Sequence, residues 1–257
     1  MNFSSIYDKR YADGYRENLS GYEIARWKAL HGLISRTLHL SDVNKVLDYG
    51  AGSGLYVGLW EIVFPTAELD FCDISSVAEQ KFQEKYPQRS NQYFMIDHDK
   101  AQCEDESYDV VVSIEVMEHV ENLQSYIRDI QRVLKPGGIF IWTTPCANAF
   151  SIEHLYSLCT GQIEPTAEGY RRWKWEDPTH LRRLKSQEAE KLLLQNEFSN
   201  IRFRFRAHLF SFLVSNLPGR RGQRLRNALM TLDYSLFRRL SNGASMIGVA
   251  QKATSLH

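Results

Sequence analysis

The chain of 257 residues lacks the features of secreted, membrane-spanning and zinc-stabilised proteins. Its four cysteines lie far apart without a C-x-x-C pair, so we expect reduced thiols rather than disulfides or a structural zinc site. The longest nearly apolar stretch, residues 208–217, is about half of the ~20 residues that span a bilayer. The segment MNFSSIYDKRY carries no basic region followed by an apolar run, which a secretory leader would have. The expected location is therefore the cytoplasm.

Net charge is also lacking, because 31 Lys and Arg balance 31 Asp and Glu. This excludes a whole-molecule charge argument for binding nucleic acid or membranes. The balance conceals a division of charge along the chain. Residues 1–170 carry 14 basic and 25 acidic side chains (−11), whereas residues 171–257 carry 17 basic and 6 acidic ones (+11). The basic last third predicts an anionic acceptor or an anionic surface as its partner.

Short apolar runs alternate with amphipathic stretches from Lys45 onward, a rhythm typical of a parallel sheet covered by helices on both faces. The expected strands are residues 45–49, 68–72, 92–96, 108–114 and 138–144, and the expected helices between them are 55–63, 76–86 and 123–134. A helix over 186–195, an alternating strand through Ile201, Phe203 and Phe205, and a last strand over 244–251 follow. The pattern predicts a doubly wound α/β fold.

Two segments stand outside this core. Residues 1–40 contain Tyr7, Tyr11 and Tyr15 and then apolar side chains at helical spacing, so they are expected to form a helix on the sheet or a lid over a ligand. Residues 41–257 are expected to form one domain, with a helical insertion at 207–243 that holds six arginines and one acid, Asp233.

The insertion has two interpretations. Its arginines could bind phosphate or bring it to an anionic membrane surface. Alternatively, it could be a solvated hairpin whose leucines pack on the body of the protein. These leucines are Leu225, Leu229, Leu232, Leu236 and Leu240.

The most informative motif is VLDYGAGSG at residues 46–54, an apolar strand entering a G-x-G-x-G turn before a helix. Glycines suit a sharp turn that a ligand approaches closely. Asp73 and Asp97 end the next two expected strands, where one carboxylate could accept the hydroxyls of a ribose and the other could bond the amine of adenine. Asp48 could orient the turn and the ammonium group of the ligand. A dinucleotide dehydrogenase would instead have G-x-G-x-x-G spacing.

Over residues 45–145 the sequence resembles the class I S-adenosylmethionine-dependent methyltransferases. The matching motifs are VLDYGAGSG, DFCDIS, Asp97 placed twelve residues before Asp109, and VLKPGG. The resemblance implies a seven-stranded Rossmann-like sheet and S-adenosylmethionine (SAM) as cofactor. The predicted cofactor-binding residues are Asp48, Gly50, Ala51, Gly52, Gly54, Asp73, Ile74, Asp97, His98 and Glu115.

A cluster of ionisable residues follows the fourth expected strand, in the sequence SIEVMEHV. If this segment begins a helix, Glu115, Glu118 and His119 stand at i, i+3 and i+4 and share one face. Two carboxylates and an imidazole at the carboxyl end of a strand predict a divalent-metal site. Hard oxygen ligands favour Mg²⁺ or Mn²⁺ over a structural zinc.

The E-x-x-E-H pattern resembles that of ubiquinone-biosynthesis O-methyltransferases and small-RNA 3′-terminal 2′-O-methyltransferases. The resemblance implies that Glu115, Glu118 and His119 surround a metal, with His180 as a further ligand and His154 as the weaker alternative. Without a metal, His119 would be a general base or a helix-start hydrogen bonder. Either version predicts a hydroxyl acceptor, because a hydroxyl is a poor nucleophile until its proton is removed. His119 and Glu118 are therefore the predicted catalytic residues.

The acceptor is expected to contact regions outside the core. Residues 170–175 alternate aromatic and basic side chains, which could stack on a ring or sugar and hold an anion. The prediction is an O-methyltransferase for a small-molecule, glycan or lipid-linked acceptor. A 2′-O-methyltransferase of RNA 3′ ends is disfavoured because the sequence shows no RNA-recognition module. A non-catalytic SAM-fold protein that binds partners through its basic end is the third alternative, and the intact glycines and acids argue against it.

Overall fold

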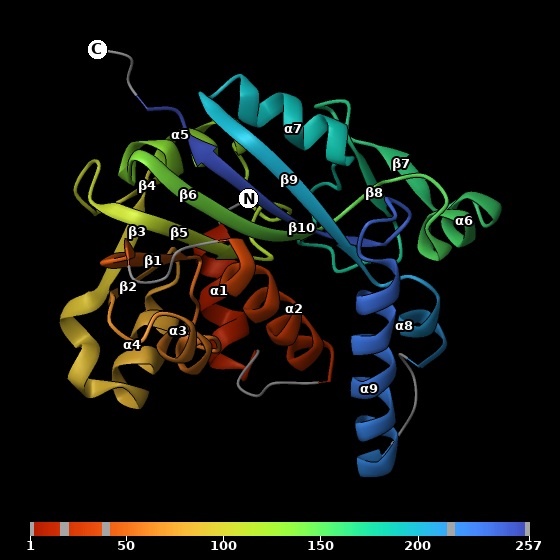
Figure 1. The fold of residues 1–257 in the computed structure, drawn as a ribbon, viewed down its shortest axis with the longest axis horizontal. Coiled ribbons are helices and arrows are strands. Elements are labelled where there is room, and N and C mark those ends of the chain that lie inside the picture. Colours follow the sequence, from red (N-terminus) through yellow and green to blue (C-terminus); the bar gives the residue numbers. More distant parts are fainter. Residues whose placement is uncertain (1–2, 16–20, 38–41, 215–218, 255–257) are drawn as a thin grey trace.

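A computed structural model describes residues 3–15, 21–37, 42–214 and 219–254. An eight-stranded sheet with the order β4-β3-β2-β1-β5-β6-β10-β9 forms its centre (Figure 1). The strands are β1 (Lys45–Tyr49), β2 (Glu68–Asp73), β3 (Tyr93–Asp97), β4 (Lys100–Ala101), β5 (Tyr108–Ile114), β6 (Leu134–Pro145), β9 (Phe198–Arg206) and β10 (Ser245–Lys252). A separate hairpin pairs β7 (Ile163–Pro165) with β8 (Arg171–Trp173).

The helices lie on both faces of the sheet and at its edges. They are α1 (Phe3–Ala12), α2 (Gly21–Thr37), α3 (Val57–Val63), α4 (Ser76–Lys85), the 3₁₀ helix η2 (Pro87–Gln92), α5 (Leu123–Val133), α6 (Ile152–Cys159), α7 (Ser186–Leu194), α8 (Leu209–Val214) and α9 (Gly219–Phe237). None of the helices in the described ranges combines the length and the apolar composition needed to cross a bilayer.

The predicted doubly wound α/β fold is confirmed, with one strand more than the expected seven. The extra strand is β4, two residues that turn back and pair antiparallel with the end of β3. Strand β6 begins at Leu134 rather than at 138, because Leu134 already pairs with Tyr108 of β5. The last strand, β10, lies antiparallel between β6 and β9.

Alternating side chains along the strands build one core on each face of the sheet. Leu47 and Val111 pack with apolar residues of α5 and α7 on one face. Val46 and Val110, the neighbours of these residues along the strands, pack with α2, α3 and α4 on the other face. This period of two explains why β1 and β5 read as nearly continuous apolar runs: both of their faces are buried.

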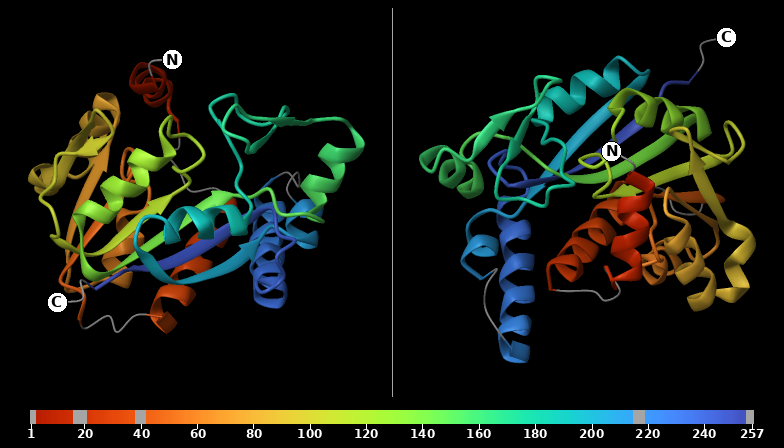
Figure 2. Two further views of the ribbon diagram at one scale, coloured as in Figure 1. Left: turned by 90° about the horizontal axis from the view of Figure 1, so that it is seen from above. Right: turned by 180° about the vertical axis from the view of Figure 1, so that it is seen from behind.

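Strands β1, β2, β3 and β5 run parallel, so their carboxyl ends meet at one edge of the sheet. Helix α1 lies across this edge and packs beside α4, as the view from behind shows (Figure 2). We call α1 the lid. Its position places the N-terminal tyrosines over the strand ends, where ligands bind in open α/β sheets.

Candidate active site

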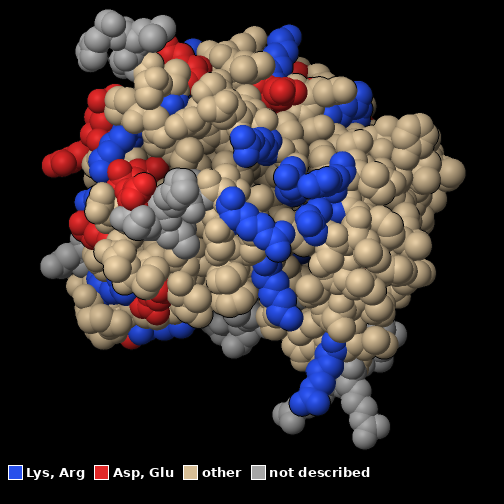
Figure 3. All heavy atoms as spheres, viewed as in Figure 1, with Lys and Arg blue, Asp and Glu red and all other residues tan. Residues whose placement is uncertain are grey.

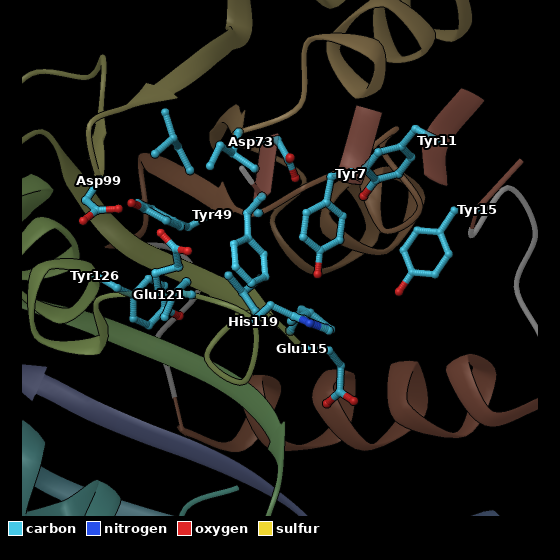
Figure 4. A pocket seen from close by; sticks show the side chains of 17 residues that line it. Tyr7, Tyr11, Tyr15, Tyr49, Asp73, Asp99, Glu115, His119, Glu121 and Tyr126 are labelled. Carbon is cyan, nitrogen blue, oxygen red and sulfur yellow. The ribbon is translucent and has the colours of Figure 1, made fainter. Parts of the chain in front are cut away.

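A pocket lies between the lid and the carboxyl ends of the strands (Figure 4). Six of its lining side chains are Phe or Tyr, from the lid and the turn after it on one side and from β1 and α5 on the other. These side chains are Phe3, Tyr7, Tyr11, Tyr15, Tyr49 and Tyr126. The charged side chains of the lining are all carboxylates: Asp73, Asp99, Glu115 and Glu121.

The glycine turn after β1 has the backbone conformation that the motif predicts. Gly50, Gly52 and Gly54 have φ values of +83°, +55° and +80°, which L side chains rarely adopt. The amides of Gly50 and Ala51 donate to the Cys72 carbonyl at 2.8 and 2.9 Å and tie the turn to β2. A Cβ on Gly52 would lie 2.2 Å from the Tyr11 hydroxyl oxygen, so the lid rests directly on the turn.

Asp73, the last residue of β2, lines the pocket beside Ile74. One carboxylate oxygen accepts the amide of Gly52 at 2.9 Å, and the other accepts the amide of Ser75 at 3.0 Å. Burial raises the pKa of Asp73, although these amide hydrogen bonds oppose the shift. The glycine turn and the start of α4 thus hold the carboxylate in one orientation beside the pocket.

Asp48 lies beneath the glycine turn rather than in the main pocket. Its carboxylate accepts the indole N–H of Trp60 at 2.6 Å and borders a small recess with Gly50 and Ala51. Burial raises the pKa of Asp48 to about 7, against the effect of the Trp60 hydrogen bond. A role in orienting the turn is compatible with this position.

Asp97 and His98 do not line the pocket, contrary to the sequence prediction. Their side chains are 68% and 95% exposed and lie 3.6 Å from each other. His98 and Asp99 have positive φ values (+47° and +60°), which reverse the chain between β3 and β4. Because of this reversal, Asp99 and Ile96 face the pocket instead.

Gly54 serves packing within the fold. A Cβ there would lie 2.8 Å from the rings of both Phe82 and Tyr86 of the α4 segment. The close approach of helix and turn requires a residue without a side chain.

The predicted helix at the start of SIEVMEHV is wrong, and with it the placement of Glu115. Glu115 has φ +56°, and the chain then forms a tight turn in which the His119 amide donates to the Val116 carbonyl. The Glu115 carboxylate points away from His119 toward α2 (Figure 4). It pairs with the buried Arg26 at 2.7 Å and accepts the Thr143 hydroxyl at 2.8 Å. Glu115 therefore does not join a metal-binding cluster.

Glu118, His119 and His180 do come together, with potential ligand atoms within 4.8 Å of one another. Glu118 is fully buried; its Oε2 accepts the Thr144 hydroxyl at 2.9 Å, and its Oε1 has no hydrogen-bond partner among the residues that the structure describes. Burial, reinforced by the charge of Glu115, raises the pKa of Glu118 to about 7. An unsatisfied buried oxygen is costly unless a ligand or ion completes it.

The tautomer of His119 follows from one contact. Its Nδ1 lies 3.0 Å from the carbonyl oxygen of Thr179. A carbonyl only accepts hydrogen bonds, so Nδ1 must carry the hydrogen. The neutral ring therefore has its lone pair on Nε2, which lies 3.8 Å from Glu118 Oε1. The ring of Tyr7 packs edge-on against His119 at 5.8 Å and brings the lid to this imidazole.

The ring of His180 packs edge-on against His119 at 4.7 Å between ring centres. Its Nδ1 lies 3.4 Å from Glu176 Oε1. Burial opposes the charge of this imidazole, but Glu176 and Glu118 outweigh that effect and raise the pKa of His180. His154, the alternative ligand, packs beside Trp173 instead.

The aromatic and basic connector at 170–175 does not line the pocket. Trp173 is fully buried under the Arg183 guanidinium. Arg171 pairs with Glu188 at 3.2 Å, and Arg172 pairs with Glu164 at 3.0 Å. These pairings occupy two of the three cations that were expected to hold an acceptor, the third being Lys174.

Two groups of site residues escaped the sequence prediction. Arg10 of the lid binds Asp177 and the Thr179 hydroxyl, next to the carbonyl that fixes His119. Asp8 of the lid accepts the Ser75 hydroxyl at 2.7 Å and the Val77 amide at 3.2 Å, at the start of α4. No motif announces these contacts, because the partners are far apart in the sequence.

Comparison with known proteins places this geometry among methyltransferases. A family described as methyltransferase domain matches residues 16–202. A ubiquinone biosynthesis O-methyltransferase of Rickettsia typhi is 33% identical over 110 residues, which cover 42% of this chain and 44% of that protein. A sterol 4-C-methyltransferase of Caenorhabditis elegans is 27% identical over 213 residues, 74% of this chain and 59% of that protein. The chain thus spans about half the length of these relatives.

Solved structures share the fold across nearly the whole chain. A putative methyltransferase of Haloferax volcanii, solved with its Trm112 activator, has a TM-score of 0.58 at 16% identity and covers 96% of this chain and 97% of its own. A SAM-dependent methyltransferase of Thermotoga maritima, described as a possible histamine N-methyltransferase, has a TM-score of 0.57 at 14% identity and covers 96% of this chain and 99% of its own. At these identities the likeness establishes the fold.

Proposed function

This chain belongs to the methyltransferase domain family and is a class I SAM-dependent methyltransferase; from that premise we propose that it methylates a hydroxyl oxygen of a small-molecule or lipid-linked acceptor, with His119 as general base. The observation that carries the proposal is the hydrogen bond from His119 to the Thr179 carbonyl, which leaves a basic lone pair on Nε2. The acceptor oxygen needs such a base because its proton must leave as the new bond forms.

The pocket fits a positively charged cofactor of this kind. When bound, SAM supplies an electrophilic methyl group on a sulfonium. Tyrosine faces attract cations, and the carboxylates of the lining add to that attraction. Asp73, held by the amides of Gly52 and Ser75, is positioned to accept the ribose hydroxyls. Asp99 takes the role predicted for Asp97 toward adenine, because Asp99 is the residue that faces the pocket.

His119 would take the acceptor proton at Nε2 while the oxygen forms its bond to the methyl carbon and the sulfur keeps the electron pair of the bond that breaks. Two neighbours favour the imidazolium that results: the Thr179 carbonyl accepts the Nδ1 hydrogen, and Glu118 lies 3.8 Å from Nε2. Tyr7 and Tyr11 cover the pocket and keep water from competing for the methyl group.

A metal-assisted version uses the same three residues differently. Glu118, His119 and His180 fit a divalent ion, since they converge and Glu118 Oε1 lacks a hydrogen-bond partner within the described ranges. Because Glu115 is not part of the cluster, the potential ligands are one carboxylate and two imidazoles. This ligand set suits Mn²⁺ better than Mg²⁺, the other ion that the sequence predicted. Such an ion would lower the pKa of a bound hydroxyl, and His119 would then be a ligand rather than the base.

The test of this proposal identifies the atom of the acceptor that receives the methyl group. Incubation of hydroxylated acceptors with SAM carrying a ¹³C-labelled methyl group should give a product whose methyl resonance in ¹³C NMR is that of an O-methyl group. A C-methyl product, the outcome that the sterol 4-C-methyltransferase relative would suggest, overturns the proposal.

A His119→Asn variant tests the general base. Asn retains a donor for the Thr179 carbonyl and lacks the Nε2 lone pair, so kcat should fall by about 10²-fold or more. Binding of S-adenosylhomocysteine should stay unchanged. Wild-type kcat in His119→Asn would show that Nε2 takes no proton.

A further inference from the structure

The hairpin of α8 and α9 presents a surface that the active site does not use. The two helices pack against each other, and α9 packs on α2 and β9. In Figure 1, α9 extends past the sheet and beyond the end of α2, with α8 at its side. One side of this long helix is therefore buried against the body, and the other side faces solvent.

The solvent side of α9 is apolar. Leu225, Leu232 and Leu236 are 51%, 44% and 60% exposed and recur at helical spacing along one face, together with the exposed Ala228. The inward side instead carries Met230 and the other residues that contact α2. The interpretation that these leucines pack on the body is therefore wrong, except for the half-buried Leu229.

Helix α8 continues the apolar character. Leu209, Phe212 and Leu213 are 46%, 48% and 64% exposed. Large apolar side chains gathered on neighbouring helices are unusual on a protein that works alone, and they mark contact with another protein or with lipid.

The acidic side chain of the insertion is buried and does not reach this surface. Asp233 is the sole acid between residues 207 and 243, and it is fully buried. Its carboxylate accepts the amides of His208 (2.8 Å) and Phe210 (2.9 Å) and the hydroxyl of Ser211 (2.9 Å). Asp233 thereby joins α9 to the start of α8, and the described surface of the hairpin carries no negative charge.

Arginines stand at both ends of the apolar face. Arg224 is exposed beside Leu225, and Arg239 is exposed beside Leu240. Arg36 of α2 and Arg202 of β9 are also exposed, and among the described residues none of these four forms an ion pair with an acid. Figure 3 shows Lys and Arg gathered over β9 and α9, while most Asp and Glu lie on the opposite side of the view.

We propose that the α8–α9 hairpin binds the surface of an anionic lipid bilayer. The leucines and Phe212 would enter the boundary between headgroups and acyl chains, and the arginines would meet lipid phosphates. A symmetric dimer through the same face fits less well. A two-fold axis would bring the arginines of one copy toward those of the other without an intervening acid.

The test measures binding to vesicles of equimolar phosphatidylglycerol and phosphatidylcholine, compared with phosphatidylcholine alone, by flotation. The wild type should bind the anionic vesicles, and added salt should weaken the binding. A Leu232→Ser/Leu236→Ser variant and an Arg224→Glu/Arg239→Glu variant should each bind at least about tenfold more weakly. Leu194→Ser is the matched control, since Leu194 of α7 is 58% exposed and lies outside the hairpin.

Each variant should retain the wild-type circular dichroism spectrum and affinity for S-adenosylhomocysteine, so that loss of vesicle binding reports on the surface alone. The proposal is overturned if the wild-type protein does not bind anionic vesicles at low salt. An equal loss of vesicle binding in Leu194→Ser also overturns it. A third contradicting result would be a wild-type dimer in analytical ultracentrifugation that the leucine substitutions dissociate, in a protein that does not bind vesicles. These results are independent of whether the acceptor atom is oxygen or carbon.

Discussion

Arg10 in the lid and Asp177 before His180 form a two-pronged ion pair across 167 residues of sequence, with nitrogen–oxygen distances of 2.5 and 3.2 Å. Burial would raise the pKa of Asp177, but Arg10 and Thr179 outweigh it and hold the pKa well below its usual range. The pair joins the cover of the pocket to the loop whose Thr179 carbonyl orients His119. One loop thus links the position of the lid to the orientation of the His119 ring.

We therefore expect Arg10→Ala and Asp177→Ala each to weaken S-adenosylhomocysteine binding several-fold and to expose the lid to proteolysis. The double variant should be little worse than either single one, with a coupling of about 1 kcal/mol, because the pair is partly solvent-screened. Arg89→Ala is the matched control, since Arg89 pairs with Glu61 at 2.9 Å away from the lid. Additive effects of the two lid substitutions would contradict a direct latch.

A second prediction separates Asp99 from Asp97. Asp99→Ala should weaken S-adenosylhomocysteine binding by about tenfold, the loss of a hydrogen bond to a charged group. Asp97→Ala should leave the affinity unchanged, because Asp97 is exposed and does not line the pocket. Isothermal titration calorimetry of both variants with S-adenosylhomocysteine measures the two affinities. If Asp97→Ala weakens binding and Asp99→Ala does not, the sequence-based assignment of Asp97 to the cofactor site stands.

A third prediction concerns metal binding. Mn²⁺ should raise the melting temperature of the wild type and should have no effect on Glu118→Ala or His180→Ala, because ions that bind only the folded state stabilise it. Glu115→Gln should lower the melting temperature through loss of the buried pair with Arg26 and yet retain the response to Mn²⁺. If full activity survives EDTA and Mn²⁺ has no thermal effect, the general-base version alone stands.

The fourth prediction is a pH dependence that comes from Asp48. The folded protein holds the pKa of this carboxyl at about 7, above the ordinary 3.8, chiefly because it is buried. The folded state thus retains a proton that the unfolded state releases. The resulting stability is fully present below pH 4 and is lost as the pH rises through 7, a contribution of up to about 4 kcal/mol.

Asp48→Asn keeps an acceptor for the Trp60 indole and removes the titration. Urea unfolding without cofactor at pH 5 and pH 8 should show that the substitution raises the free energy of unfolding more at pH 8. An equal effect at both values would show that Asp48 does not carry the shift.

The sequence determined the architecture and the cofactor turn. Strands β1 and β5 were predicted at their observed ends, because side chains buried on both faces leave an unmistakable apolar run. The glycine turn and Asp73 were identifiable for a similar reason: the positive φ values and the strand end are local properties of a few consecutive residues. Family membership followed from the same local motifs.

Only the tertiary structure decided which ionisable side chains meet. Glu115 has the right spacing for a helical cluster, but its positive φ and the buried Arg26 of α2 turn it away from Glu118. His180 reaches the cluster through the fold of a distant loop. The direction of a side chain depends on backbone reversals and on partners far along the chain. A local pattern contains neither of these, and so the site had to be found in three dimensions.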